Sequence, residues 1–176
     1  LRVTNVDELQ KATKLILPGV GSFDEAMRRL NASGLREGLD HYVLDQGVDV
    51  LGVCVGMQIM AAHSEEGELP GLGWVDATVK RFRQDGNVRL RVPHMGWNNL
   101  EVFEQTGIFE GMSSPFFYFL HSYMVCPAND AIVAGRADYG GNFCAAFVSG
   151  NIHGVQFHPE KSHGDGMRLL KNFALN

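Results

Sequence analysis

Two short, mainly apolar runs that each end at a glycine-bearing turn constrain the fold of this chain most strongly. They cover residues 15–17 and 48–53, and apolar runs without polar alternation are typical of parallel strands that are buried on both faces. Helical spacing of apolar residues follows each run, from about Asp24 after the first and over 55–63 after the second. This alternation of strand and helix predicts an α/β fold.

The second half of the chain has a different pattern, in which β-like runs are separated by Gly, Asn and Asp. Such a pattern predicts hairpins. The runs cover residues 74–82, 88–92, 99–103, 116–125, 132–137, 143–148 and 152–157. A final amphipathic helix is predicted over about 164–175, with Met167, Leu170 and Phe173 on one side. We therefore expect an α/β fold with an open, mixed, mostly parallel central sheet and flanking helices.

Composition limits the classes of protein that the chain can belong to. Its 176 residues are 45% apolar and 20% charged, as in globular domains, and no repeat or linker divides them, so we expect a single domain over residues 1–176. The net charge of −5, without a Lys/Arg cluster, argues against nucleic-acid binding, and no apolar window is long enough for a membrane span. Three cysteines in apolar surroundings favour reduced thiols in a cytoplasmic protein.

The segment Gly-Val-Cys-Val-Gly at residues 52–56 has the form Gly-x-nucleophile-x-Gly between a predicted strand and a predicted helix. In that setting Cys54 occupies a tight, strained turn with its side chain above the sheet, and the amide of Val55 points toward a developing oxyanion. The start of the helix also favours the thiolate form of the cysteine. Taken alone, the segment is explained equally well by a small buried cysteine beside a tight turn.

His158-Pro159-Glu160 follows a predicted buried strand and therefore lies at a carboxyl-terminal strand end, where α/β sheets hold their sites. Pro159 favours an extended conformation for His158. Residues two apart in an extended chain project to the same side, so Glu160 can accept a hydrogen bond from the imidazole and orient it toward a nucleophile. Alone, the tripeptide is better explained by a surface turn. Together with Cys54 it forms a Cys-His-Glu constellation.

The turn Pro-Gly-Val-Gly at residues 18–21 ends the other early strand. Its two glycines allow a peptide to rotate and to aim an amide into a cleft, although an ordinary turn between strand and helix explains this segment as well. The remaining histidines and cysteines lack the spacing of a metal site, and no glycine-rich phosphate-binding pattern is present. We therefore expect neither a metal nor a cofactor.

Five ordered segments resemble the class I (triad) glutamine amidotransferases and, within that family, the glutaminase subunits of imidazole glycerol phosphate synthases. They are Leu-Pro-Gly-Val-Gly-Ser-Phe (17–23), Gly-Val-Cys-Val-Gly-Met-Gln (52–58), Val-Pro-His-Met-Gly-Trp-Asn (92–98), Tyr-Phe-Leu-His-Ser-Tyr (118–123) and Gly-Val-Gln-Phe-His-Pro-Glu-Lys-Ser (154–162). The elbow and His-Pro-Glu are shared across the family, whereas Pro-His-Met-Gly-Trp-Asn and the final Lys-Ser point to the subfamily.

The resemblance implies a role for individual residues. Cys54 would be the nucleophile that attacks the side-chain amide of L-glutamine, His158 the general base and acid, and Glu160 its orienting partner. The oxyanion would be held by the backbone amides of Val20 and Val55. The residues implied in substrate binding are Gly19, Gly21, Gln58, Ser122 and Tyr123. Val55 replaces a leucine that is usual in the family, a change that we expect to be neutral because the backbone amide acts.

The resemblance also implies a heterodimer with a (β/α)₈ barrel cyclase, to which ammonia passes inside the complex. Trp97, Tyr118 and Lys161 match family positions at the docking face. Family members begin with a further strand and helix that precede the first segment found here, so we expect the first strand and helix of the fold to be missing from this chain. Two other interpretations stay open: a glutaminase that supplies a different synthase, and a non-catalytic module of the same fold.

Overall fold

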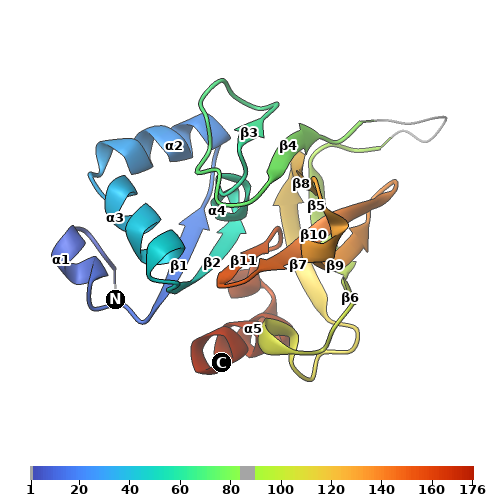
Figure 1. Ribbon diagram of the computed structural model, residues 1–176. Helices are drawn as coiled ribbons and strands as arrows, with labels where there is room; N and C mark the ends of the chain where they lie inside the picture. The colour runs from blue at the N-terminus through green and yellow to red at the C-terminus, as the bar shows by residue number, and fades with distance from the viewer. Residues whose placement is uncertain (1, 84–89) are drawn as a thin grey trace.

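A computed structural model describes residues 2–83 and 90–176 of the chain (Figure 1). The described strands form an open nine-stranded sheet in the order β1-β2-β11-β10-β8-β4-β3, with β9 paired to β10 and to β6. These strands are β1 (Lys14–Gly19), β2 (Asp49–Cys54), β3 (His63–Ser64), β4 (Ala77–Arg81), β6 (Glu101–Val102), β8 (Tyr123–Pro127), β9 (Val133–Asp138), β10 (Asn142–Ser149) and β11 (Ile152–Val155). Separately, β5 (His94–Asn99) pairs antiparallel with β7 (Phe116–His121).

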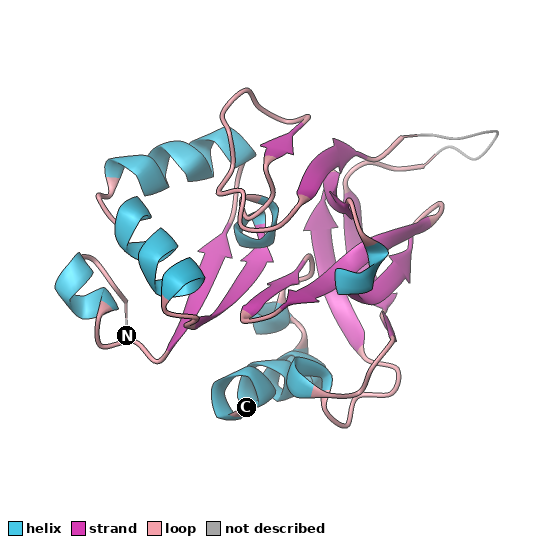
Figure 2. Ribbon diagram, viewed as in Figure 1, coloured by secondary structure: helices cyan, strands magenta, loops and turns pink. Residues whose placement is uncertain are grey.

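Helices flank the strands, and one short helix follows directly at the end of β2 (Figure 2). They are α1 (Val6–Leu9), α2 (Phe23–Ala32), α3 (Arg36–Asp40), α4 (Val55–Gln58) and α5 (His163–Leu175), with a π turn at His41–Asp45 and 3₁₀ turns at Gly107–Phe109, Asp130–Ile132 and Pro159–Lys161. The first three helices gather beside β1, and α5 lies apart from them at the C-terminus. In the described part of the chain, no helix has the length and hydropathy needed to cross a membrane.

The predicted mixed, open sheet with flanking helices is confirmed, but parallel pairing does not predominate among the described strands. β2 pairs parallel with β1 and β11, and β3 with β4. The pairs β10/β8, β10/β9, β10/β11, β4/β8 and β6/β9 are antiparallel. Short connections explain the difference. Gly150 and Asn151 alone join β10 to β11, and a two-residue turn permits only antiparallel partners.

Several predicted strands differ from those observed. The run 116–125 splits into β7 and β8, which belong to different sheets. In the run 99–103, Asn99 ends β5 and residues 101–102 form β6. In the run 88–92, residues 88–89 lie outside the described residues and residues 90–92 form no strand. The strand in this region is β5, which the sequence pattern did not predict.

The predicted helix over 55–63 ends at Gln58. The carbonyls of residues 59–62 accept instead from the amides of residues 71–75, and the amide of Ala62 donates to the carbonyl of Ala77 at the start of β4. These longer-range bonds satisfy the carbonyls that further helical turns would have used.

The predicted C-terminal helix is confirmed as α5, but its buried side is different from the predicted one. Met167 is 66% exposed, whereas Leu169 and Phe173 are buried. Leu169 and Phe173 are four residues apart and therefore lie on the same face of the helix.

The carboxyl-terminal ends of β1, β2 and β11 lie side by side, with Gly19 opposite Cys54 and Val53 opposite Val155. Sites in open α/β sheets form at this edge. Just beyond β11, Phe157 is fully buried and stacks on Phe117 of β7, with 3.7 Å between ring centroids. This packing fixes the segment that carries His158 against the same edge.

Candidate active site

Cys54 ends β2 and is followed directly by α4, in a tight turn with φ +54° and ψ −111°. This backbone conformation is strained for a residue with a side chain. Glycines on both sides make the turn sterically feasible. A Cβ at Gly56 would collide with the carbonyl oxygen of Leu17 in β1, and a Cβ at Gly52 would lie 2.8 Å from the backbone nitrogen of Met57. The predicted strained elbow at Cys54 is therefore present.

The Cys54 side chain is buried, with 4% of the residue exposed. Its Sγ lies 3.8 Å from Nε2 of Gln156 and 3.9 Å from the carbonyl oxygen of Leu120. Burial raises the pKa of the Cys54 thiol to about 11, although the backbone amide of Val55 lowers it in part. The expected thiolate is therefore disfavoured in this state, because desolvation outweighs the favourable effect of the short helix that follows.

His158 and Glu160 make the contact that the sequence predicted. The imidazole Nδ1 lies 2.8 Å from Oε1 of Glu160. His158 is 3% exposed, whereas the Glu160 side chain is 54% exposed. The His158 backbone is held on both sides, since its amide donates to the carbonyl of Tyr118 and its carbonyl accepts from the hydroxyl of Ser162. A carboxylate at Nδ1 leaves Nε2 as the unprotonated nitrogen of a neutral imidazole.

Cys54 and His158 line one cavity of about 300 Å³. The other lining residues are Val20, Gly21, Val55, Gln58, Glu66, Pro93, Leu120, His121, Ser122, Tyr123 and Lys161. A nucleophile, a base oriented by a carboxylate, and backbone from two turns thus surround a space large enough for a small molecule. In the described residues, no three His, Cys, Asp or Glu side chains converge in a way that could hold a metal ion.

Most of the residues predicted to bind substrate line this cavity. Gly21, Ser122, Tyr123 and Gln58 do so, and Gln58 is buried rather than solvated. Gly19 does not line the cavity. A Cβ at Gly19 would collide with the backbone nitrogen of Gly56, so this glycine permits the close approach of β1 and α4.

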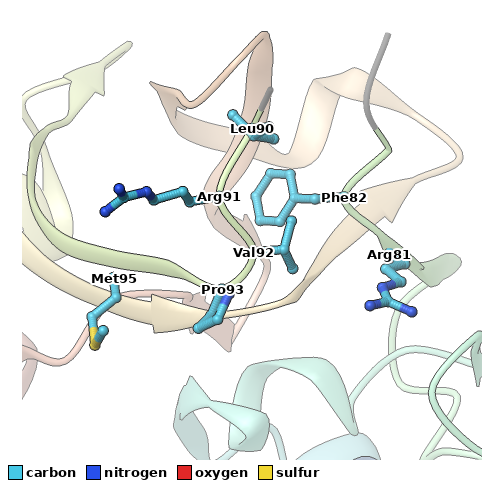
Figure 3. A pocket seen from close by; sticks show the side chains of 7 residues that line it. All are labelled: Arg81, Phe82, Leu90, Arg91, Val92, Pro93 and Met95. Atoms are coloured by element: carbon cyan, nitrogen blue, oxygen red, sulfur yellow. The ribbon is translucent and has the colours of Figure 1, made fainter. Parts of the chain in front are cut away.

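A larger cavity of about 850 Å³ lies beside the first and shares Pro93 with it. Figure 3 shows Phe82, Val92 and Leu90 gathered between the side chains of Arg81 and Arg91. Among the described residues that line it, the side chains are apolar or cationic, and none is a nucleophile or a general base. Chemistry of the predicted kind therefore belongs to the smaller cavity.

The residues predicted for docking form one group, in which Trp97 and Lys161 are exposed and Tyr118 is half-buried. Trp97, which is 40% exposed, stacks on His163 with 5.2 Å between ring centroids and makes an edge contact with Tyr118 at 6.0 Å. Nζ of Lys161 lies 5.7 Å from the centroid of the Tyr118 ring. Because Lys161 also lines the smaller cavity, this aromatic and cationic surface is continuous with the candidate active site.

Comparison with known proteins assigns the family. The model of the family described as glutamine amidotransferase class-I matches residues 2–176. This chain belongs to the class-I glutamine amidotransferases. A Bdellovibrio bacteriovorus protein named imidazole glycerol phosphate synthase subunit HisH is 52% identical over 170 residues, covering 96% of this chain and 83% of that protein. A Leptospira interrogans protein of the same name is 49% identical over 175 residues, covering 98% and 85%.

Solved structures share the amidotransferase fold. A structure described as glutamine amidotransferase has a TM-score of 0.74 at 20% identity, covering 98% of this chain and 85% of that one. A structure described as a putative GMP synthase protein from Thermoplasma acidophilum has a TM-score of 0.68 at 24% identity, covering 96% and 74%. Both place the mixed sheet described above in the fold of this family.

Sequence reasoning missed three polar residues at or behind the smaller cavity. Glu66 and His121 line it. Gln156, which directly follows β11, places its side-chain amide nitrogen near the sulfur of Cys54. Nothing in the local pattern around Glu66 marks it out. For Gln156 a signal existed, because a polar side chain inside an apolar run, two residues before a proposed base, needs a buried partner.

Proposed function

We propose that this chain is the glutaminase subunit of an imidazole glycerol phosphate synthase, which hydrolyses L-glutamine to glutamate and ammonia. The observation that carries the proposal is the shared cavity of Cys54 and of His158, with Glu160 on the second imidazole nitrogen. The subunit names of relatives that are 52% and 49% identical over nearly the whole chain support the pathway.

The chemistry starts from a protonated thiol. As Sγ of Cys54 attacks the side-chain amide carbon of glutamine, its proton passes to Nε2 of His158, and Glu160 stabilises the resulting imidazolium. The oxyanion is held by the backbone amides of Val20 and Val55. The imidazolium then protonates the leaving nitrogen, and ammonia departs to leave a thioester. Water, deprotonated by His158, hydrolyses the thioester and releases glutamate and the thiol.

The other end of glutamine carries an ammonium and a carboxylate. Glu66 supplies a carboxylate in the cavity and is itself held by the backbone amide of Phe23, at 2.8 Å from Oε2. It is suited to bind the ammonium. Gly21, Ser122 and Tyr123 supply backbone around the rest of the substrate. The side-chain amide of Gln58 donates a hydrogen bond to the carbonyl of Tyr123.

Ammonia must reach its acceptor without entering bulk water, where a base of this strength is protonated and loses its nucleophilicity. We propose a heterodimer with a (β/α)₈ barrel cyclase, docked on Trp97, Tyr118 and Lys161. Exposed aromatic and cationic side chains are typical anchors of protein interfaces. The three cysteines are free, which agrees with a reducing compartment, and we place the enzyme in the cytoplasm.

The test is Cys54→Ala in the complex with the cyclase. We expect glutamate formation from glutamine to be lost, because the nucleophile is absent, while the cyclase still binds and still turns over with added ammonia. Wild-type complex is the control in both assays. Glutamine turnover by the Cys54→Ala complex would contradict the mechanism, and a wild-type chain that captures a synthase other than a barrel cyclase would favour the alternative pathway.

A further inference from the structure

Two histidines outside the proposed catalytic steps form a buried pair behind the cavity. His94 in β5 and His121 at the end of β7 are cross-strand partners, 3% and 6% exposed. Nδ1 of His94 lies 3.0 Å from Nε2 of His121. His94 stacks between Tyr139 and Phe119, at 4.0 and 4.8 Å between ring centroids. His121 lines the cavity, whereas His94 does not.

The hydrogen bonds of this pair run in one direction, which proton counting determines. Nδ1 of His121 lies 2.8 Å from the carbonyl oxygen of Tyr123, and a carbonyl can only accept, so Nδ1 carries the proton. Nε2 of a neutral His121 is then an acceptor, and Nδ1 of His94 must donate to it. The remaining nitrogen of His94, Nε2, is an acceptor that faces the side-chain amide nitrogen of Asn98 at 3.4 Å.

Burial supports the neutral state that this arrangement requires. Desolvation lowers the pKa of His94 to about 4 and that of His121 to about 3. Protonation of His121 at Nε2 would place this N–H against the Nδ1–H of His94, and protonation of His94 at Nε2 would place it against the side-chain amide N–H of Asn98. The pair is therefore a fixed, uncharged hydrogen-bond unit at neutral pH.

The last acceptor of this unit is the carbonyl of Tyr123, which also accepts a hydrogen bond from a residue that lines the cavity. Nε2 of Gln58 donates to the oxygen of Tyr123 at 3.1 Å, so both lone pairs of this oxygen are occupied. Gln58 also donates to Oε1 of Gln156 at 3.0 Å. This bond turns the amide nitrogen of Gln156 toward the sulfur of Cys54, at 3.8 Å. The chain of bonds thus leads from β5 to the proposed nucleophile.

We propose that His94 is a positioning residue for the glutaminase cavity, because its donation to His121 fixes the Tyr123 carbonyl and, through it, the amides of Gln58 and Gln156. This role rests on the proposed function of the cavity. His94 lies on β5, which also carries the exposed Met95 and Trp97. The pair of His94 and His121 therefore connects the position of β5 with the shape of the cavity.

Three variants separate the hydrogen bond from packing. His94→Phe keeps a flat ring between Tyr139 and Phe119 but removes the donor. His94→Asn returns an N–H close to the position of Nδ1. Tyr139→Phe keeps the stacked ring and removes only the hydroxyl, which donates to the carbonyl of Arg91, so it controls for disturbance of the aromatic surroundings.

With the cyclase complex, we expect His94→Phe to raise KM for glutamine by about tenfold, with a smaller change in kcat, because a buried acceptor loses its donor. His94→Asn should recover most of the affinity, and Tyr139→Phe should match wild type. The proposal is wrong if His94→Phe has wild-type KM, or if a folded His94→Asn is as impaired as His94→Phe.

Nitrogen NMR of the imidazoles in the full wild-type chain tests the same point without any variant. At pH 7 we expect His121 and His94 both to be neutral and protonated at Nδ1. A proton on Nε2 of His121 would overturn the proposed direction of the bonds. If the wild-type complex hydrolyses no glutamine, the proposed function fails and the positioning role falls with it, while the NMR result still decides the state of the pair.

Discussion

At Cys54 the backbone conformation determines where the sulfur lies, and burial determines the protonation state of the thiol. The strained turn places Sγ at the cavity, and burial keeps the thiol protonated by raising its pKa to about 11. A protonated thiol is a weak nucleophile, so the sulfur becomes reactive when a base removes its proton. In the proposed mechanism His158 is that base, and the contact of its Nδ1 with Glu160 orients the ring.

Replacement of Glu160 by Gln tests this dependence on the carboxylate. We expect kcat for glutamine hydrolysis to fall about 10²-fold with little change in KM, because an amide does not stabilise the imidazolium that forms during attack. The matched control is Glu66→Gln, which removes a carboxylate from the binding end of the cavity and should raise KM more than it lowers kcat. Steady-state kinetics measure both variants. The assignment is contradicted if Glu160→Gln mainly raises KM and Glu66→Gln mainly lowers kcat.

The sequence predicted the pair His158 and Glu160 because their contact is local and depends only on an extended backbone. It also predicted the elbow at Cys54, since the flanking glycines mark a turn where backbones approach closely. Glu66 could not be predicted in this way, because its place in the cavity depends on the path of a long connection. Gly19 was assigned to substrate binding, yet it lies against α4 and outside the cavity lining.

At the scale of elements, the site depends on how closely α4 packs on β1. Strands β1 and β2 were predictable from their apolar runs, but the expected burial on both faces holds only for β2, because Ile16 of β1 is 52% exposed. β5 was not, since it buries His94 and exposes Met95 and Trp97, which reverses the usual relation between hydropathy and burial. A strand that exposes apolar side chains on one side and buries a polar pair on the other does not have the pattern of a core strand.

The packing of α4 on β1 predicts the effect of a single methyl group. Gly56→Ala places Cβ against the backbone carbonyl of Leu17, which cannot move without displacing β1, so we expect a loss of about 3 kcal/mol in the free energy of unfolding. Gly164→Ala in α5 is the matched control, because no atom lies within 4 Å of its added Cβ, and it should be neutral or stabilising by up to about 1 kcal/mol. Urea denaturation measures both, and equal stabilities would refute the packing argument.

At the scale of the whole molecule, the buried histidines make stability depend on pH. In the unfolded chain an imidazole titrates near pH 6.5, whereas in the folded protein the pKa of His121 is about 3 and that of His94 about 4. Below pH 6.5 the unfolded state therefore binds protons that the folded state does not. Stability is lost as pH falls from 6.5 toward 4 and is independent of these two groups above about pH 7.

His121→Phe isolates the larger of these two contributions. Between pH 7 and pH 5 the unfolded state gains most of one proton at this position, so wild type should lose about 2 kcal/mol of unfolding free energy through His121 alone. The variant loses a buried hydrogen bond and starts from a lower stability at pH 7, but its decrease between pH 7 and pH 5 should be smaller by that amount. Carboxylates that begin to titrate near pH 5 do so in both proteins and cancel in the comparison, and the exposed His63→Gln variant should keep the wild-type decrease. Equal decreases in wild type and His121→Phe would mean that His121 is protonated in the folded protein, and the one-directional hydrogen bonds behind the cavity could then not exist.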